Sequence, residues 1–284
     1  MFDGVHRGHR LILDTLTGEA ARRGMASTVL TFVHHPLALL APEREPRRLS
    51  SNAGRRQLLR EAGVDSIIET RFETVRMLTA RQFLENFASI GVRALVMGFN
   101  NHIGSDRLDA DAAAALGIVD IIKVVPDASL EGISSTAIRE ALGRGDAAAA
   151  AAMLGRPYPV DGSVGEGKRL GRTIGFPTAN IIADDPAVII PARGVYAVDL
   201  RLDGDDTARR GMCNIGHRPT VDAPGAPESI EVNIFDFDAD IYGRKAEVRF
   251  LDRLRDEKKF NSLDELARAL EADRRAANTI GSKQ

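Results

Sequence analysis

Two histidines near the N-terminus have a spacing that suits the binding of an anion. His6 and His9 lie three residues apart at the expected start of a helix, so both imidazoles share one helix face. Gly8 between them lets a ligand approach the backbone, and the N–H groups of a helix N-terminus favour negative charge. The pattern suits a polyphosphate. A solvated turn is the competing interpretation of a bare H-x-x-H pair, and zinc lacks further ligands nearby.

Hydroxyl groups gather at the start of a later helix in the first half of the chain. Ser134, Ser135 and Thr136 can cap the N–H groups of that helix or hold phosphate oxygens. Arg139, near the first turn, can bind a phosphate with two N–H groups. Because parallel-sheet enzymes bind ligands at the carboxyl ends of their strands, where helices begin, we expect this segment and the histidine segment to converge.

The first half of the sequence alternates helical and strand-like stretches, which predicts a parallel sheet covered by helices on both faces. A parallel α/β domain normally begins with a strand, but this sequence enters a helix by residue 10, so the first strand is expected to be missing. The predicted helices are 11–21, 52–61, 79–90, 108–116, 134–142 and 146–154, and the predicted strands are 26–33, 64–68, 93–99 and 118–125.

The sequence pattern changes at residues 155–159, from alternating helical and strand-like stretches to short β-rich segments. This change predicts one domain over 1–154 and a second over 155–284. Short β-rich segments between Gly, Pro and Asp then predict an antiparallel sheet or barrel with a terminal helix. The glycine-rich stretch 162–180 can wrap phosphates with its N–H groups but lacks the Walker spacing, and in isolation it is typical of a flexible hairpin. The predicted strands are 194–202, 211–215, 229–237 and 245–251, and the helix runs from 262 to about 276.

Composition excludes several classes of protein. The 284 residues carry 38 Lys+Arg and 40 Asp+Glu, a formal net charge of −2, so no strong overall field attracts nucleic acid or an anionic membrane. The single cysteine, Cys213, cannot form an intramolecular disulfide. No apolar run approaches the ~18 residues that span a bilayer, and the N-terminus lacks the pattern of a signal peptide. We therefore expect a soluble, cytoplasmic protein.

The first half resembles the FMN adenylyltransferase domain of bifunctional riboflavin kinase/FAD synthetases, a Rossmann-like nucleotidyltransferase. The resemblance rests on the H-x-G-H segment at residues 6–9 and the I-S-S-T-x-x-R segment at residues 133–139. Residues 31–36 are similar to the family's T-F-x-P-H-P segment, with Val33 and His34 in place of its acid and proline. Residues 98–104 keep Asn100 and both glycines, while Asn101 and Ile103 replace common aromatics. The residues that this resemblance implies for FMN adenylylation are His6, His9, Asn100, Ser134, Ser135, Thr136 and Arg139.

The second half resembles the riboflavin kinase domain of the same family. Residues 177–180 form its P-T-A-N motif, and three further motifs follow in the family's order, at residues 194–197, 214–220 and 240–243. The resemblance implies that Thr178 and Asn180 bind Mg²⁺ and nucleotide phosphate. Glu231 matches the catalytic base, with Glu228 as its competitor. The other residues implied in nucleotide or substrate binding are Gly165, Lys168, Gly175, Pro177 and Arg255.

The resemblance implies two successive reactions on small-molecule substrates. The C-terminal domain is expected to phosphorylate riboflavin with ATP, and the N-terminal domain to adenylylate the resulting FMN with a second ATP, with Mg²⁺ as the cofactor and neither nucleic acid nor a membrane as partner. Two alternatives remain: a riboflavin kinase whose adenylyltransferase domain is inactive without its first strand, and a flavin-binding regulator without catalysis. The sequence leaves the oligomeric state open.

Overall fold

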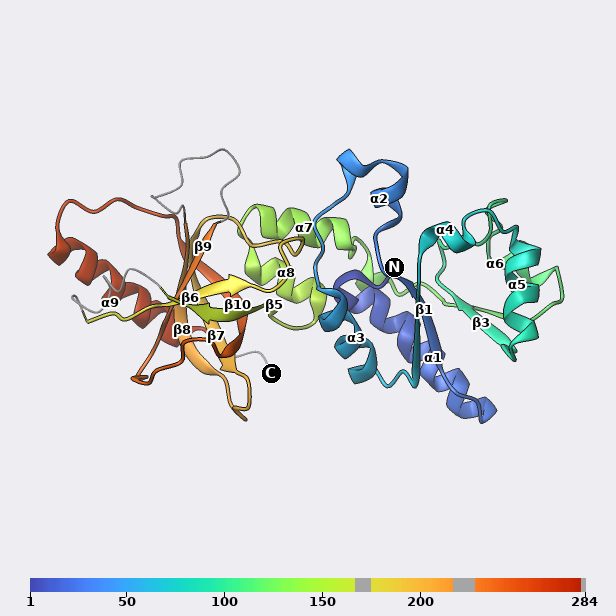
Figure 1. The fold of residues 1–284 in the computed structure, drawn as a ribbon, viewed down its shortest axis with the longest axis horizontal. Helices are drawn as coiled ribbons and strands as arrows, with labels where there is room; N and C mark the ends of the chain where they lie inside the picture. The colour runs from blue at the N-terminus through green and yellow to red at the C-terminus, as the bar shows by residue number, and fades with distance from the viewer. Residues whose placement is uncertain (167–174, 217–227, 282–284) are drawn as a thin grey trace. The chain divides into compact units, whose positions relative to one another are not determined.

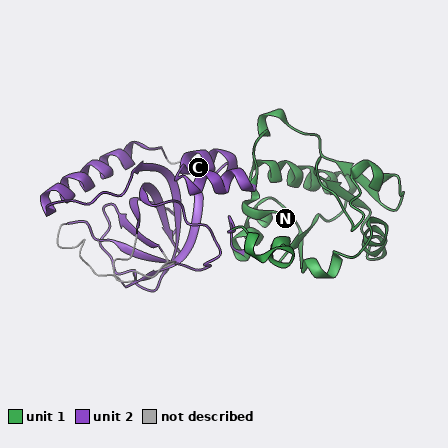
Figure 2. Cartoon of the chain, turned by 90° about the horizontal axis from the view of Figure 1, so that it is seen from above, with its two compact units in different colours: residues 1–46, 52–134 green, residues 47–51, 135–284 purple. Residues whose placement is uncertain are grey.

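The computed structural model describes residues 1–166, 175–216 and 228–281. The chain separates into two compact units, coloured apart in Figure 2. Unit 1 comprises Met1–Pro46 and Asn52–Ser134, and unit 2 comprises Arg47–Ser51 and Ser135–Gln284. The two helices that precede residue 155 pack with the second unit, while the domain boundary at residue 154 stays a prediction.

Unit 1 is an α/β structure with parallel strands, as predicted. Strand β1 (Thr28–Phe32) pairs in parallel with β2 (Ser66–Thr70), and β3 (Ala94–Met97) pairs in parallel with β4 (Asp120–Lys123) (Figure 1). The expected sheet is thus present as two ladders, which share no strand within the described residues. The helices are η1 (Asp3–Val5), α1 (Arg7–Arg23), α2 (Pro36–Leu40), η2 (Pro42–Arg44), α3 (Asn52–Glu61), α4 (Phe72–Val75), α5 (Ala80–Ser89), α6 (Ala110–Ala114) and η3 (Ala128–Leu130).

Local sequence signals explain where helices α1 and α5 begin and end. His6 caps the N-terminus of α1 by accepting a hydrogen bond from the backbone N–H of His9. The helix ends at Gly24, whose φ of 62° is left-handed and suits glycine. Thr79 and Gln82 form a capping box at the start of α5. The histidine pair that the sequence singles out therefore also caps the N-terminus of α1.

Unit 2 is a closed antiparallel barrel with strand order β10-β5-β6-β9-β8-β7, which confirms the predicted class. Helices α7 (Ser135–Gly143) and α8 (Ala147–Leu154) contribute Leu142 and Leu154 to the core that fills the barrel. The terminal helix α9 (Leu263–Thr279) packs on the outer wall through Ala277. The strands are β5 (Tyr158–Gly165), β6 (Ala179–Ala183), β7 (Gly194–Leu202), β8 (Arg209–Gly216), β9 (Ser229–Ile234) and β10 (Lys245–Arg255).

A short segment from the first half of the sequence, Arg47–Ser51, is built into unit 2. The Arg48 backbone N–H donates to Ala187 O at 2.7 Å, and Ile189 N–H donates to Arg48 O at 2.8 Å. The Arg48 guanidinium pairs with Asp185 at 2.7 Å. Leu49 is 1 % exposed and belongs to the barrel core. Unit 2 therefore depends on residues that lie outside its main sequence range.

Leu49→Ala is expected to destabilise unit 2 by about 2–5 kcal/mol, because it leaves a cavity in a packed core. All three tyrosines of the chain, Tyr158, Tyr196 and Tyr242, lie in unit 2, so their near-UV circular dichroism reports its unfolding in urea separately. Leu40→Ala is the matched control, because Leu40 is exposed and lies in unit 1. An unchanged urea midpoint for Leu49→Ala would show that the segment is dispensable to unit 2.

Candidate active sites

The histidine pair forms a stacked, partly enclosed cluster at the N-terminus of α1. The His6 and His9 rings stack with centroids 3.7 Å apart, and the Phe2 ring lies 5.1 Å from the His9 ring. The backbone N–H of His9 donates to His6 Nδ1 at 3.3 Å. The buried Nδ1 of His9 has no hydrogen-bond partner among the described residues. This orphaned polar atom at a helix N-terminus is what a site for a polar, anionic ligand requires.

The surroundings keep His9 neutral near neutral pH. Burial lowers the pKa of His9 well below 6.5, and the neighbouring His6 and the chain's amino terminus lower it further. A neutral imidazole retains one N–H donor and one acceptor nitrogen. His9 can therefore donate one hydrogen bond to a phosphate oxygen without carrying a proton that burial disfavours.

The lowered pKa of His9 predicts a pH-dependent stability of unit 1. Below about pH 6.5 the unfolded chain takes up a proton that folded His9 refuses, so the free energy of unfolding falls as the pH falls from that value toward the folded pKa. Urea titrations followed by far-UV circular dichroism at several pH values measure this slope. His9→Gln is expected to flatten it, since glutamine does not titrate. An equal slope in both proteins would contradict the lowered pKa.

The two predicted segments of unit 1 meet beside Gly8. A Cβ at Gly8 would lie 3.3 Å from the His6 ring and 4.0 Å from Ile133 O, so the backbone just before Ser134 passes the histidine pair. The turn that contains exposed Asn100 follows β3, and a Cβ on its Gly98 would lie 3.1 Å from Ile12 of α1. His6, His9, Ser134 and the turn of Asn100 thus gather around the first turns of α1.

The remaining predicted residues of this segment belong to unit 2. Ser135 and Thr136 open α7, which lies on the other side of the unit boundary. The Nε of Arg139 donates to Arg47 O at 2.7 Å, so this side chain contacts the Arg47–Ser51 segment. Their contact with a phosphate remains a prediction.

Three of the predicted kinase residues, Gly165, Asn180 and Glu231, form one row with Asn214 across the outer wall of the barrel. Gly165 of β5 pairs with Asn180 of β6, Asn180 pairs with Glu231 of β9, and Glu231 pairs with Asn214 of β8. Their neighbours Ala179, Ile181, Ile230 and Val232 face the barrel core. Directly paired residues share a face of a sheet, so the row points away from the core.

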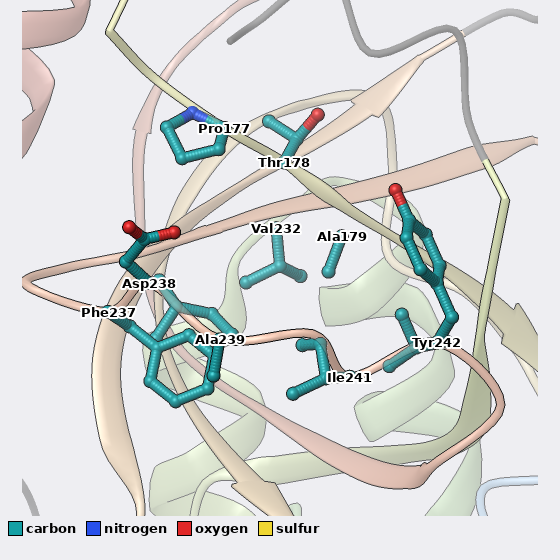
Figure 3. A pocket seen from close by; sticks show the side chains of 11 residues that line it. Pro177, Thr178, Ala179, Val232, Phe237, Asp238, Ala239, Ile241 and Tyr242 are labelled. Carbon is teal, nitrogen blue, oxygen red and sulfur yellow. The ribbon is translucent and has the colours of Figure 1, made fainter.

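A hollow at the end of the barrel core adjoins this row (Figure 3). Pro177 and Thr178 lie on one side of it, with Phe237, Ile241 and Tyr242 across from them. The hollow is open to solvent, and its cavity volume is about 60 Å³. Thr178 lines the hollow and Asn180 lies two residues further on in the row. Thr178, just before β6, therefore lies at the hollow, and Asn180 of β6 lies on the polar outer surface.

Two ion pairs bear on the candidate charged residues. Glu228, the competitor of Glu231, pairs with Arg193 at 3.3 Å, while Glu231 lies in the row. Arg255 binds Asp273 of α9 with two nitrogens, Nε at 3.0 Å and Nη2 at 2.8 Å. This ion pair anchors α9 to β10, and contact of Arg255 with a nucleotide remains a prediction.

Several other residues complete the comparison with the sequence. Gly175, with a φ of 80°, lies just before Pro177, whereas Lys168 lies outside the described residues. Sequence reasoning did not select Asn214 or Glu257, although Asn214 Nδ2 lies 3.4 Å from Glu257 Oε1 beside the row. Nor did it select Asn233, whose amide contacts Pro177 O. Asn214 opens a motif that the sequence analysis did identify, and that position was the available signal.

The fold and its two clusters define a class: a protein of two units, a parallel α/β unit with a histidine cluster at a helix N-terminus and a closed antiparallel barrel with a carboxylate beside a hollow. Residues 1–136 match the family profile described as FAD synthetase, and residues 154–280 match the profile described as riboflavin kinase. The chain belongs to the family of bifunctional riboflavin kinase/FMN adenylyltransferases.

Individual relatives agree over nearly the whole chain. The bifunctional riboflavin kinase/FMN adenylyltransferase of Bacillus subtilis is 34% identical over 97% of this chain and 89% of its own length. That of Escherichia coli K12 is 37% identical over 96% of this chain and 88% of its own length. A crystal structure described as a macrolide-efflux protein from Streptococcus pneumoniae superposes with a TM-score of 0.89 and 33% identity, covering 99% of this chain and 92% of that one. In the part of the chain that the structure describes, no helix is long and apolar enough to cross a membrane.

Proposed function

We propose that this chain phosphorylates riboflavin with ATP to give FMN and then transfers AMP from a second ATP to FMN, giving FAD and pyrophosphate. Family membership over both halves supports the pair of activities. The observation that carries the assignment of residues is the row Gly165, Asn180, Glu231 and Asn214 beside the hollow at Thr178. The substrates are small molecules, and the proposed location of the protein is the cytoplasm.

Kinase chemistry needs a base at the acceptor and a holder for the phosphates. The Glu231 carboxylate takes the proton of the riboflavin 5′-hydroxyl while that oxygen bonds to the γ-phosphorus of ATP. The bond from the γ-phosphorus to the oxygen that bridges to the β-phosphate breaks, and ADP leaves. The hollow is the proposed place of the adenine, since Thr178 at its edge adjoins the place of the phosphates. The flavin then lies on the outer wall, where Glu231 faces.

The donors near the kinase row fit Mg²⁺. Thr178 and Asn180 offer a hydroxyl and an amide oxygen, which are hard ligands. The described residues include no group of three or more His, Cys, Asp or Glu side chains that could hold a metal ion. The Thr178 hydroxyl and the Asn180 amide oxygen suit an ion that is held mainly by substrate phosphates, as Mg²⁺ commonly is in kinases. When bound, the ion neutralises charge on the transferring phosphate.

Adenylyl transfer in unit 1 needs no protein nucleophile. An oxygen of the FMN phosphate attacks the α-phosphorus of ATP, and the bond to the β-phosphate side breaks, releasing pyrophosphate. The site's task is to align the two phosphates and to stabilise the additional negative charge. Neutral His9, His6 and the N-terminal N–H groups of α1 supply that stabilisation, and Ser134 opens the neighbouring segment.

Position-specific labels of ATP test both transfers. With riboflavin and [γ-³²P]ATP, FMN and FAD should both carry label, because the γ-phosphate becomes the FMN phosphate. With [α-³²P]ATP only FAD should carry it. Label from the α-position in FMN, or unlabelled FMN from γ-labelled ATP, would contradict the proposed chemistry.

A further inference from the structure

The buried side chain of Asn233 contacts the segment that precedes β6. Its side-chain nitrogen Nδ2 donates to the carbonyl oxygen of Pro177 at 2.6 Å. The residue is 6 % exposed, although it lies on β9 two residues beyond Glu231. Alternation along a strand places Asn233 and Glu231 on the same outer face. Strand β9 therefore carries both the candidate base, Glu231, and Asn233, which holds the backbone just before β6 by a hydrogen bond.

The hydrogen bond from Asn233 to Pro177 lies where the pairing of β6 with β9 ends. The recorded pairs between β6 and β9 run from Ile181↔Ile230 through Asn180↔Glu231 to Ala179↔Val232. Pro177 lies beyond the last of these pairs, and proline has no N–H with which to extend a ladder. The Asn233 amide supplies a hydrogen bond there and so fixes the backbone immediately before Thr178. The Asn233 side chain is buried, so its amide would lose its hydrogen bond without replacement by bulk water if this contact broke, which favours the contact.

We propose that Asn233 is a positioning residue for the kinase reaction: it holds Thr178, and with it the ATP phosphates, at a fixed distance from Glu231. The inference rests on the proposed roles of Thr178 and Glu231. Glu231, which receives the proton, and Asn233, which holds the segment of Thr178, both lie on strand β9. The γ-phosphorus and the attacking hydroxyl therefore stay aligned. A misplacement of about 1 Å at a reacting centre can reduce the rate about 10²-fold.

This role predicts a particular pattern of kinetic constants. Without the amide donor the kcat for riboflavin phosphorylation should fall ~10- to 100-fold through misalignment. The KM for riboflavin should stay within ~3-fold, because the Asn233 side chain is buried and offers the flavin little surface to contact. FAD formation from added FMN should not change, since its candidate residues lie elsewhere. A purely structural role would instead lower stability and leave the kcat of the folded enzyme intact.

Three variants of the full-length chain separate these outcomes. Asn233→Leu removes the donor at similar volume, and Asn233→Ser, whose hydroxyl is too short to reach, repeats the test with less bulk if the leucine variant fails to fold. Asn233→His restores a donor, because histidine Nδ1 is bonded to Cγ as asparagine Nδ2 is. Tyr158→Phe is the matched control: it removes another buried side-chain hydrogen bond of unit 2, from Tyr158 to Ile189 O at 2.8 Å.

Steady-state kinetics and thermal unfolding are measured for each protein. Support requires a low kcat in Asn233→Leu or Asn233→Ser, recovery in Asn233→His, and a normal kcat in Tyr158→Phe despite its lower melting temperature. A normal kcat in folded Asn233→Leu, or an equal loss in Asn233→His, overturns the proposal. Failure of the proposed function itself is seen separately, as absence of FMN from the wild-type chain or an undiminished rate in Glu231→Gln.

Discussion

Glu231→Gln is expected to lower the rate of riboflavin phosphorylation by ~10²- to 10⁴-fold, the usual contribution of a general base. Glutamine has nearly the same shape but cannot accept the proton of the 5′-hydroxyl. FAD formation from added FMN should continue at the wild-type rate, because the residues proposed for that reaction lie in the histidine cluster of unit 1. The two activities are measured separately by chromatography of the flavins, starting from riboflavin or from FMN.

Glu228→Gln is the matched control for this substitution. Glu228 lies three residues before Glu231 and pairs with Arg193 on the surface, so its loss should change kinase activity only slightly. A near-normal rate in Glu231→Gln together with a large loss in Glu228→Gln would transfer the role of base to Glu228.

His9→Ala is expected to reduce FAD formation by ~10²- to 10³-fold, the cost of removing one preorganised donor to developing charge. The substitution removes the half-buried imidazole that stacks on His6 at the start of α1. FMN formation from riboflavin should be unaffected, so FMN should accumulate in a reaction that supplies excess ATP. Its accumulation over time is the measurement.

Arg10→Ala is the control on the same helix. Arg10 follows His9 directly, is exposed, and pairs with Asp14 at 3.4 Å on the helix surface. It should keep both activities. Loss of FMN formation as well as FAD formation in a folded His9→Ala variant would contradict separate active sites for the two reactions.

Elements with strong local signals could be predicted closely from the sequence. Helix α3 and strand β7 have the predicted bounds, and Thr79 caps α5 as expected, because periodic apolar residues and caps are local properties. Strand β5 was not predicted, since its glycines are typical of a flexible hairpin. In the barrel, a Cβ at Gly162 would lie 2.5 Å from Ile182 O. Glycine there permits close approach of two strands, which only the tertiary structure reveals.

The candidate kinase site divides in the same way. Asn180 and Glu231 could be selected from motifs, but their direct pairing depends on strand register, which the sequence leaves open. Asn233 and Glu257 contact residues 56 and 43 positions away, so no local pattern indicates them. The insertion of Leu49 into the barrel core is likewise a long-range contact. Chemistry could be predicted from the motifs, whereas the neighbours that position it required the structure.

The central claim, that one chain carries out both reactions, is tested most directly by a time course. The purified 284-residue chain is incubated with riboflavin, excess ATP and Mg²⁺, and the flavins are separated by chromatography. The account predicts that FMN rises first and that FAD follows at its expense. FMN that accumulates without FAD would contradict the adenylyltransferase assignment, and riboflavin that stays unchanged would contradict both.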